Sequence, residues 1–437
     1  MPSTLLPTVL DLQYLLVSRD GVIVLEHSSE ILDKLPCFYV RRLPEPGTMT
    51  QRVALVFGAS GVSGWAMTRE LLLYPSQKTF TRIIALSNRP LSHDVFLLDD
   101  PRLELVSGID LTQPVDVVVR LLREKNRNIE QVTHVYWYAY VHAPKDGSIA
   151  EVNCTLLDTS LHALKETSPN MAHFIWQTGG KYYGAHLTRE VIIPPAPWKE
   201  DAPRLPEPFA STIFYYKQTD IIKEHAKSSS WRWNDVRPEH VIGYGPATNA
   251  MNLALILGLY LSLYRAVHGI GAQIMLPASI AGANAISGES PADHLARSAI
   301  WLSLREDGAL SGRSFNVAVP PSTYADRWID LAAAWGLEGI ATGQEDSDPT
   351  RAGAEVAKWI GEHASAWYAL EREHGLHPGL LGMMDFGFLF AISIPVDRYH
   401  DCSAIKEAGW TEESQAAATY YREAWRRFAE AKILPPM

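Results

Sequence analysis

The stretch VALVFGASGVSG, from Val53 to Gly64, decides the fold of this chain. An apolar, β-branched run leads directly into Gly58, Gly61 and Gly64, and the helix-like WAMTRELLLY follows at once. Only glycine lets a backbone turn this tightly and approach a pyrophosphate, which then rests on the amides and positive end of the helix. Three glycines also fit an ordinary turn, so the flanking strand and helix carry the prediction of a dinucleotide-binding loop.

Strand and helix patterns alternate beyond this loop. The apolar runs RIIALSN, LELVSGID, THVYWYAY and HFIWQTG are separated by helical stretches such as VDVVVRLLREK and VNCTLLDTSLHALKE. This alternation predicts an α/β fold with a doubly wound, Rossmann-type parallel sheet. After WRWNDVRPEHVIGYGP the pattern becomes mainly helical. We therefore expect an NADP-binding domain at residues 49–245 and, within the same folding unit, a smaller substrate-covering lobe at residues 246–437.

Residues 1–48 do not fit this alternation. The first fifty residues contain only short apolar runs and end in the turn-rich RRLPEPGTMT, in which Met49 stands just before the first strand of the nucleotide-binding pattern. Two interpretations stay open at this point. The segment is either an accessory strand or arm, or an upstream extension with little structure that belongs to the gene model rather than to the folded protein.

The second strand indicates which dinucleotide fits. It ends in IIALSNRP, so Asn88 and Arg89 stand where an enzyme that uses NAD usually presents an acidic residue to the ribose. Such a donor pair suits the 2′-phosphate of NADPH, although a solvated surface arginine would give the same pattern. Asp110 meets the adenine edge or simply closes a turn. The predicted cofactor contacts are Gly58, Ser60, Gly61, Val62, Gly64, Asn88, Arg89, Asp110, Leu111, Gln177 and Val241.

The composition makes several classes of protein improbable. The 437 residues include 49 acidic and 39 basic side chains with no Lys/Arg-rich block, so no nucleic-acid partner is expected. Three dispersed cysteines, and histidines such as His142 and His186 without ligand spacing, predict free thiols and no metal site. The longest apolar run, from Asn252 to Tyr264, is too short to cross a bilayer. No signal peptide is recognisable, which predicts a cytoplasmic protein.

A tyrosine pair downstream raises the question of catalysis. Short-chain dehydrogenases carry a Tyr-x-x-x-Lys pair on one helical face, and IFYYKQTDII offers Tyr215 and Tyr216 at the start of a helix. However, the positions four residues later are Thr219 and Asp220. This helix therefore supplies a candidate tyrosine without the expected lysine.

Two lysines compete for the missing role. Lys78 completes the literal motif that starts at Tyr74, but it falls at the end of the first helix, away from the edge where chemistry is expected, so we interpret the match as a coincidence. Lys181 follows the buried run HFIWQTG instead. That position is the carboxyl end of a strand, where catalytic groups of open α/β folds collect.

Several motifs, in a fixed order, resemble the progesterone 5β-reductase and iridoid synthase-like enzymes, an atypical branch of the short-chain dehydrogenases. Besides the glycine loop they are THVYWYAY, VNCTLLDTSLHAL, QTGGKYY, EDAPRLP, FYY, VRPEHVIGYGP and SFNVA, spread from about Val53 to Trp410. The resemblance implies that Lys181, in TGGKYY, and Tyr215, in FYY, form the catalytic pair, with Tyr216 packing beside them.

The chain departs from the family pattern near the expected substrate space. Tyr182 replaces the usual histidine after the lysine, Ala139 and Tyr140 stand where a Thr-Trp pair is typical, and Gly184-Ala185 replaces a Gly-Pro pair. The family's substrates therefore do not transfer to this chain.

By this resemblance, the reaction is hydride transfer from a nicotinamide to the β-carbon of a small apolar α,β-unsaturated carbonyl compound, in secondary metabolism. Tyr215 would donate to the carbonyl oxygen and Lys181 would hold the nicotinamide ribose. Two alternatives stay open: direct reduction of a ketone or aldehyde, and a regulatory protein that binds NADP without turnover. The sequence also leaves open whether Trp137, Tyr138 and Tyr140 line the pocket or fill the core, and whether the protein is a homodimer.

Overall fold

The computed structural model describes most of the chain. The described residues are 14–18, 21–24 and 41–42 near the N-terminus, and 51–437 without 97, 143–146, 188–192, 247–251, 344, 346–347 and 349–350. By its internal contacts the chain divides into two compact units, Met1–Gln51 and Arg52–Met437.

The first unit contains three short strands that form an antiparallel sheet in the order β2-β1-β3. The strands are β1 (Tyr14–Ser18), β2 (Gly21–Val24) and β3 (Arg41–Arg42). The rest of residues 1–50, Met49 included, lies outside the described part of the chain. Both interpretations of residues 1–48, an accessory arm or an extension outside the folded protein, stay open.

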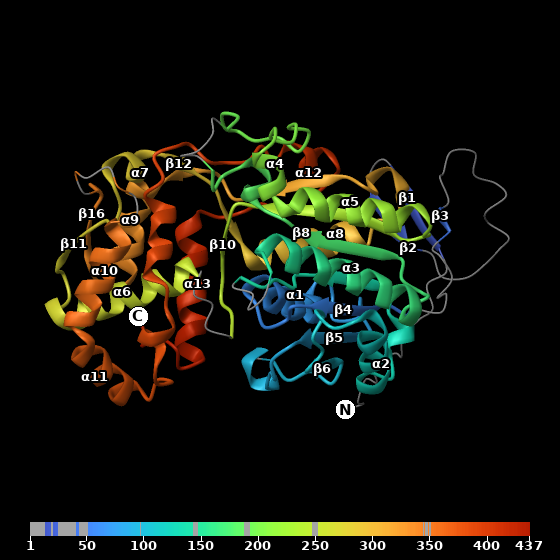
Figure 1. The fold of residues 1–437 in the computed structure, drawn as a ribbon, viewed down its shortest axis with the longest axis horizontal. Coiled ribbons are helices and arrows are strands. Elements are labelled where there is room, and N and C mark those ends of the chain that lie inside the picture. The colour runs from blue at the N-terminus through green and yellow to red at the C-terminus, as the bar shows by residue number, and fades with distance from the viewer. Residues whose placement is uncertain are drawn as a thin grey trace, which may run out of the picture. The chain divides into compact units, whose positions relative to one another are not determined.

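The second unit is built on seven parallel strands in the order β14-β9-β8-β7-β4-β5-β6. This confirms the predicted Rossmann-type α/β fold, and the order reverses beside β4, the strand that carries the glycine loop (Figure 1). The strands are β4 (Val53–Phe57), β5 (Arg82–Ser87), β6 (Leu103–Ser107), β7 (His134–Trp137), β8 (His173–Gln177), β9 (Arg232–Pro238) and β14 (Ser314–Val317).

Alternate residues of each strand enter different cores, because successive side chains point to opposite faces of a sheet. In β4, Ala54 and Val56 pack with the helices α1 (Val62–Leu73) and α8 (Ala292–Ser303). Val53, Leu55 and Phe57 pack on the other face. That face is covered by α2 (Val115–Lys125), α3 (Ile149–Thr167) and α5 (Phe214–Lys227).

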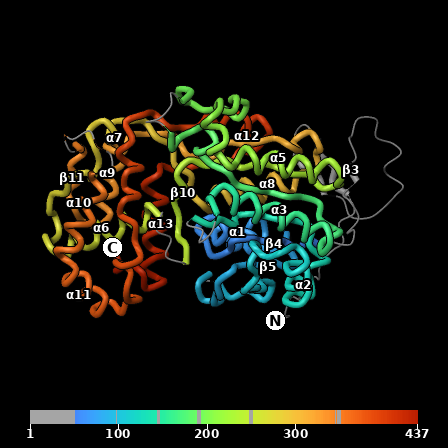
Figure 2. Tube along the Cα trace, viewed as in Figure 1, coloured from blue at the N-terminus to red at the C-terminus, as the bar shows by residue number. Residues whose placement is uncertain are grey.

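The later part of the chain is mainly helical, with three small two-stranded pairings. The helix α13 packs against α6 and α9 in this lobe (Figure 2). The helices are α6 (Leu253–His268), α7 (Ile280–Asn284), α9 (Tyr324–Ala334), α10 (Arg351–Glu362), α11 (Ala364–His374), α12 (Ser403–Glu407) and α13 (Ala417–Glu430). The paired strands are β10 (His240–Ile242) with β13 (Glu289–Pro291), β11 (Gln273–Met275) with β16 (Glu338–Ile340), and β12 (Ile286–Ser287) with β15 (Ser322–Thr323).

Two elements of the range predicted for the lobe belong to the sheet. The strand β14 forms its edge beside β9, and α8 packs along α1. The chain therefore leaves the seven-stranded sheet after β9, builds part of the lobe, returns to the sheet in β14 and leaves it again. The short helices between these elements are η2 (His93–Phe96), η3 (Ile129–Gln131), η4 (Gly180–Tyr183), α4 (Phe209–Thr212), η5 (Gly308–Leu310), η6 (Leu380–Met383) and η7 (Phe386–Ile392).

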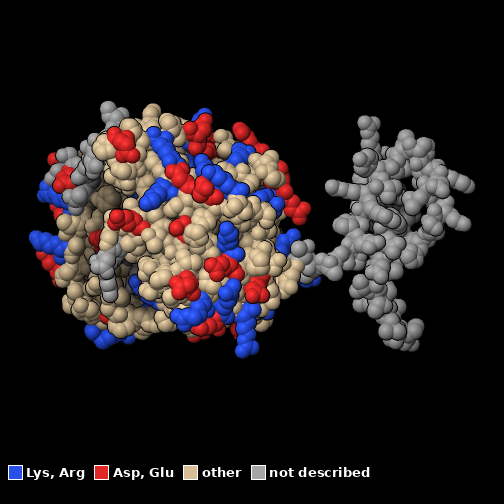
Figure 3. Space-filling model, turned by 45° about the vertical axis from the view of Figure 1, so that its right-hand side comes forward, with Lys and Arg blue, Asp and Glu red and all other residues tan. Residues whose placement is uncertain are grey.

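Acidic and basic side chains alternate over the surface of the second unit, on the face that Figure 3 presents. The apolar run that begins near Asn252 forms the buried helix α6. No helix in the described part of the chain combines the length and the hydropathy needed to span a membrane. Cys154 and Cys402 are free thiols, as predicted, and Cys37 lies outside the described residues.

Candidate active site

The glycine loop links the end of β4 to the start of α1. The backbone N–H groups of Gly58 and Ala59 both donate to the Leu86 carbonyl at 3.0 Å, which joins the loop to the end of β5. Gly58 has a φ of +78°, and a Cβ there would lie 2.7 Å from the Tyr138 carbonyl. A Cβ on Gly64 would overlap the Gly58 carbonyl. Two of the three glycines are therefore required by the protein's own packing.

Gly61 is different, because no described residue occupies the space that its side chain would fill. The nearest heavy atom to a Cβ there, the Gly58 carbonyl oxygen, lies at an ordinary 3.5 Å. Gly61 is also the N-cap residue of α1, whose first turn has no acidic side chain and no side-chain cap. The positive end of this helix is thus free to meet an anion. These residues fit the pyrophosphate of a dinucleotide.

A cavity of about 440 Å³ lies beside this loop and receives most of the predicted site residues. The predicted residues that line it are Gly58, Ser60, Gly61, Val62, Gly64, Gln177, Lys181, Tyr215 and Val241. Gln177 also donates from Nε2 to Ser63 Oγ at 2.9 Å, which links the end of β8 to the first turn of α1.

Four predicted cofactor contacts do not line this cavity: Asn88, Arg89, Asp110 and Leu111. Asn88 and Arg89 are exposed after β5, and Leu111 is buried. Asp110 accepts hydrogen bonds from the Thr112 backbone N–H at 2.9 Å and from the Thr112 hydroxyl at 2.7 Å. Its carboxylate thus closes a turn, and a contact with the adenine edge stays a prediction.

Lys181 lies in η4, the turn that follows β8 at the carboxyl edge of the sheet. Its side chain is exposed to the cavity, and desolvation by the cavity walls lowers the pKa of the ammonium. The same surroundings hold His186. Burial, with a smaller contribution from the charge of Lys181, lowers the pKa of His186 to about 4, so this imidazole is neutral at pH 7.

Tyr215 lies in the first turn of α5 and faces the same cavity. Its ring meets Trp176 edge-on, with centroids 6.3 Å apart, and contacts Phe214 at 4.5 Å. Burial is the main cause that raises the pKa of Tyr215, with smaller contributions from Tyr140 and Asp235. The phenol therefore keeps its proton at neutral pH and is available as a hydrogen-bond donor.

The residues that stand in place of the helical lysine have structural partners. Thr219 donates its hydroxyl proton to the Tyr215 carbonyl at 2.8 Å. Asp220 accepts two hydrogen bonds from the guanidinium of Arg204, at 2.6 and 2.9 Å. This fork joins α5 to the EDAPRLP segment. Lys78 is not among the residues that line the cavity.

Tyr216 connects α5 to η4, the turn that carries Lys181. The sequence predicted only that Tyr216 packs beside the catalytic pair. Its hydroxyl donates to the Tyr182 carbonyl at 2.8 Å and accepts from the Leu205 backbone N–H at 3.1 Å. The rings of Tyr182 and Tyr216 meet edge-on with centroids 4.9 Å apart. The second tyrosine of FYY thus connects the helix that carries Tyr215 to the residue next to Lys181.

The departure from the family pattern at Tyr182 has a partner of its own in the buried Arg237. The guanidinium of Arg237 lies 3.6 Å from the ring centroid of Tyr182 and donates to Asp235 at 2.6 Å. It also donates to the hydroxyl of Tyr183 at 3.2 Å, and that hydroxyl donates to Asn316 at 2.7 Å. Arg237 and Asn316 belong to the motifs VRPEHVIGYGP and SFNVA. The sequence identified these motifs but did not predict what the two side chains contact.

Aromatic and aliphatic side chains form an apolar part of the cavity wall. Trp137, Tyr138 and Tyr140 all line it, although Trp137 also belongs to the core. Tyr140 is 38% exposed and stacks on Phe214 with ring centroids 6.1 Å apart. The segment around η7 adds residues that the sequence did not identify, because nothing local marks them: Phe388, Phe390, Ala391 and Ile394.

The buried side chain of Glu239 lies against η4, the turn that carries Lys181. Glu239 Oε1 is 3.9 Å from Arg398 Nη1, and Glu239 Oε2 is 3.4 Å from His400 Nε2. A Cβ on Gly180 would overlap Glu239 Oε2, so this carboxyl group lies against the backbone of the turn. Burial raises the pKa of Glu239 to about 7, although the charge of Arg398 acts in the opposite direction.

Comparisons with known proteins fix the class of the chain. It is 34% identical over 391 residues to the short chain dehydrogenase sirQ of Leptosphaeria maculans, covering 88% of this chain and 97% of the relative. It is 32% identical over 399 residues to the short chain dehydrogenase ausT of Aspergillus calidoustus, covering 89% and 95%. The protein is thus an oxidoreductase of the short-chain dehydrogenase/reductase class.

More specifically, the chain belongs to the PRISE-like Rossmann-fold family, whose model matches residues 54–435. This confirms the resemblance drawn from the motifs. Plant members are more distant: the 3-oxo-Delta(4,5)-steroid 5-beta-reductase of Arabidopsis thaliana is 26% identical over 297 residues, 67% of this chain and 72% of the relative.

Solved structures support the fold alone. The terminal R domain of the myxalamid PKS-NRPS biosynthetic pathway superposes with a TM-score of 0.56 at 17% identity, over 88% of this chain and 92% of that one. The GDP-mannoheptose C4 reductase MlghC of Campylobacter jejuni, solved with NADP bound, gives 0.54 at 12% identity, over 87% and 99%.

Proposed function

We propose that this protein is an NADPH-dependent reductase of α,β-unsaturated carbonyl compounds, which adds hydride to the β-carbon of an enone or enal. One observation carries the proposal. Among the described residues, neither the Lys181 ammonium nor the Tyr215 hydroxyl has a hydrogen-bond or ion-pair partner, and both residues line the same cavity. Polar groups that lack a partner at a cavity wall are suited to bind a ligand rather than to stabilise the fold.

Tyr215 has the properties of a donor to the substrate's carbonyl oxygen. Addition at the β-carbon places negative charge on that oxygen, and a fixed donor there lowers the barrier by about 3 kcal/mol in other enzymes. The raised pKa of Tyr215 keeps the proton on the phenol. Lys181 places a positive charge at the same cavity, which favours the tyrosine's role and is available to the nicotinamide ribose.

The cofactor in this proposal is NADPH, which supplies the hydride when bound. The open space at Gly61 and the uncapped start of α1 suit its pyrophosphate. Arg89 is exposed after β5 and has no hydrogen-bond or ion-pair partner in the described part of the chain, so it is free to pair with a 2′-phosphate.

The substrate in this proposal is a small apolar carbonyl compound. Phe388, Phe390, Ile394 and Tyr140 provide the apolar wall. Among the relatives, the name 3-oxo-Delta(4,5)-steroid 5-beta-reductase describes reduction of an unsaturated ketone, while the fungal relatives are named only as short chain dehydrogenases. We place the reaction in secondary metabolism and in the cytosol as part of the same proposal.

The test is a panel of enones, enals and saturated ketones, with NADPH consumption as the readout and product analysis for each active compound. We expect consumption with enones and a saturated carbonyl as the product. An allylic alcohol from the enone, together with turnover of the matching saturated ketone, would instead identify a direct carbonyl reductase. NADPH binding without consumption across the panel would favour a non-catalytic NADP-binding protein.

A further inference from the structure

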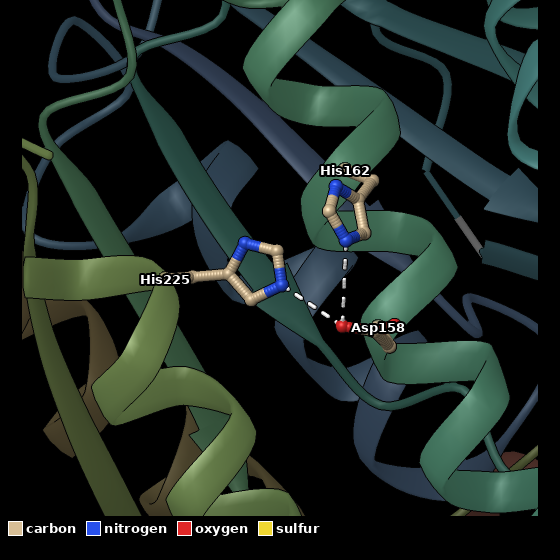
Figure 4. Close-up of side chains that lie close together, drawn as sticks. All are labelled: Asp158, His162 and His225. Atoms are coloured by element: carbon tan, nitrogen blue, oxygen red, sulfur yellow. Dashed lines mark hydrogen bonds and ion pairs between the residues drawn. The ribbon is translucent and has the colours of Figure 1, made fainter. Parts of the chain in front are cut away.

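Three side chains with metal-ligand chemistry meet between α3 and α5, on the side of the sheet that these helices cover (Figure 4). Asp158 and His162 are four residues apart on α3, so they lie on the same face of that helix. His225 comes from the last turn of α5. In Figure 4 both imidazole rings turn a nitrogen toward the same carboxylate oxygen.

The distances between these ligand atoms match a coordination sphere. His225 Nε2 lies 2.9 Å and His162 Nε2 lies 3.8 Å from Asp158 Oδ1, and the three atoms all lie within 4.8 Å of one another. A tetrahedral ion with bonds of about 2.1 Å separates its ligand atoms by about 3.4 Å. The two measured distances fall on either side of that value, so small rotations of the side chains would complete the geometry.

Solvent reaches two of the three side chains of the cluster. The His225 side chain is mostly buried, whereas those of Asp158 and His162 are about half exposed, which leaves an open path from solvent. Within the described residues, Asp158 forms ion pairs with these two histidines and with no lysine or arginine. Two imidazoles and one carboxylate form a ligand set that Zn²⁺ prefers.

We propose that Asp158, His162 and His225 bind a divalent cation of the Zn²⁺ type, which ties α5 to α3. The sequence predicted no metal site, because the helical spacing of Asp158 and His162 supplies only two ligands. Packing supplies the third, since His225 reaches the pair on α3 only when α5 lies beside it.

The cation has a structural role in this proposal. His225 follows Tyr215 by ten residues on the same helix. At 1.5 Å per residue, that separates the two positions by about 15 Å along the axis. The bound ion therefore holds α5 in place rather than touching the substrate. The proposal stands or falls independently of the reaction that Tyr215 supports.

The experiment is a titration of the chelator-treated, full-length protein with ZnCl2, followed by calorimetry and by the melting temperature. We expect one saturable ion per chain and a melting temperature raised by about 2 °C or more, because an ion that binds only the folded state stabilises it. When Co²⁺ is bound in place of Zn²⁺, the protein should show the visible absorption bands of a tetrahedral Co²⁺ site.

Single variants test the assignment. His162→Ala and Asp158→Asn, at half-exposed positions, should each weaken Zn²⁺ binding by about tenfold or more, and His225→Ala should do the same. The matched control is His374→Ala, which removes another histidine beside a carboxylate, Glu373 at 3.9 Å. It should bind Zn²⁺ as the wild type does. No saturable binding by the wild type, or equal binding by the His162→Ala/His225→Ala double variant, would overturn the proposal.

Discussion

The two ends of the cavity are built in different ways. The nucleotide end comes from one continuous stretch, Val53 to Gly64, in which a positive φ and close backbone contacts leave almost no freedom. The proposed catalytic end is assembled from separate segments: η4 carries Lys181, α5 carries Tyr215 and η7 provides part of the apolar wall. Local sterics thus determine the first end, and contacts between distant segments determine the second.

This difference decides which part of the cavity a substitution can change. At the catalytic end the positions depend on contacts such as the Tyr216 hydroxyl on the Tyr182 carbonyl and the Arg237 guanidinium over the Tyr182 ring. A substitution there can change the pocket while the glycine loop stays as it is. The departures at Tyr182 and Tyr140 lie at this end of the cavity.

The largest effect is expected at the catalytic pair. Tyr215→Phe removes one hydroxyl and keeps the ring's packing, so turnover should fall by about a hundredfold while NADPH affinity holds. Lys181→Ala should lower turnover and also weaken NADPH binding, because the same ammonium is assigned to the ribose. Steady-state kinetics and a binding titration measure both.

Lys78→Ala is the control for this pair, since it removes the lysine of the literal Tyr-x-x-x-Lys motif. We expect no change in either constant. If Lys78→Ala abolishes turnover and Lys181→Ala does not, the catalytic end has been placed at the wrong lysine.

The nucleotide end should respond differently at two neighbouring glycines. Gly64→Ala forces a Cβ onto the Gly58 carbonyl and should destabilise the fold by about 1–3 kcal/mol. Gly61→Ala meets only an ordinary contact, so stability should change by no more than about 0.5 kcal/mol, whereas NADPH affinity should drop by about tenfold or more. Thermal melting and a titration separate the two; equal NADPH affinity in Gly61→Ala and wild type would contradict the pyrophosphate assignment.

A smaller, selective effect is expected at Arg89. Arg89→Ala should weaken NADPH by about 1.5–3 kcal/mol and leave NADH nearly unchanged, because only NADPH carries the 2′-phosphate. Paired dissociation constants for the two cofactors measure it. An equal loss for both would show that Arg89 does not select the cofactor.

The smallest effect is expected at the N-terminus. A chain that begins at Met49 retains the whole unit Arg52–Met437, so it should fold and bind NADPH with little change in melting temperature. Calorimetry of the shortened and full-length proteins tests this. Insolubility, or loss of NADPH binding, would mean that the unit Met1–Gln51 contributes to the folded enzyme.

The sequence predicted those parts of the molecule that local chemistry determines. The glycine loop and the parallel sheet could be predicted because φ at Gly58 and the apolar strands leave few alternatives. Lys181 and Tyr215 were proposed from their places at a strand end and a helix start, but only the order of the motifs paired them, because the two residues are 34 positions apart in the sequence. Phe388 in the pocket wall and the partner of His225 on α3 were not predictable, because both depend on which surfaces of distant helices meet.

Tyr216 has a consequence for exchanging parts between relatives. The segment from Tyr182 to Leu205 begins and ends at one hydroxyl oxygen on α5, because that oxygen binds the carbonyl at one end and the N–H at the other. The segment is also held between these ends, since the Tyr183 hydroxyl donates to Asn316 and the Arg204 guanidinium binds Asp220. A chimera that exchanges this segment therefore has to carry the tyrosine at position 216 and these partners with it, and it should leave the cofactor unchanged.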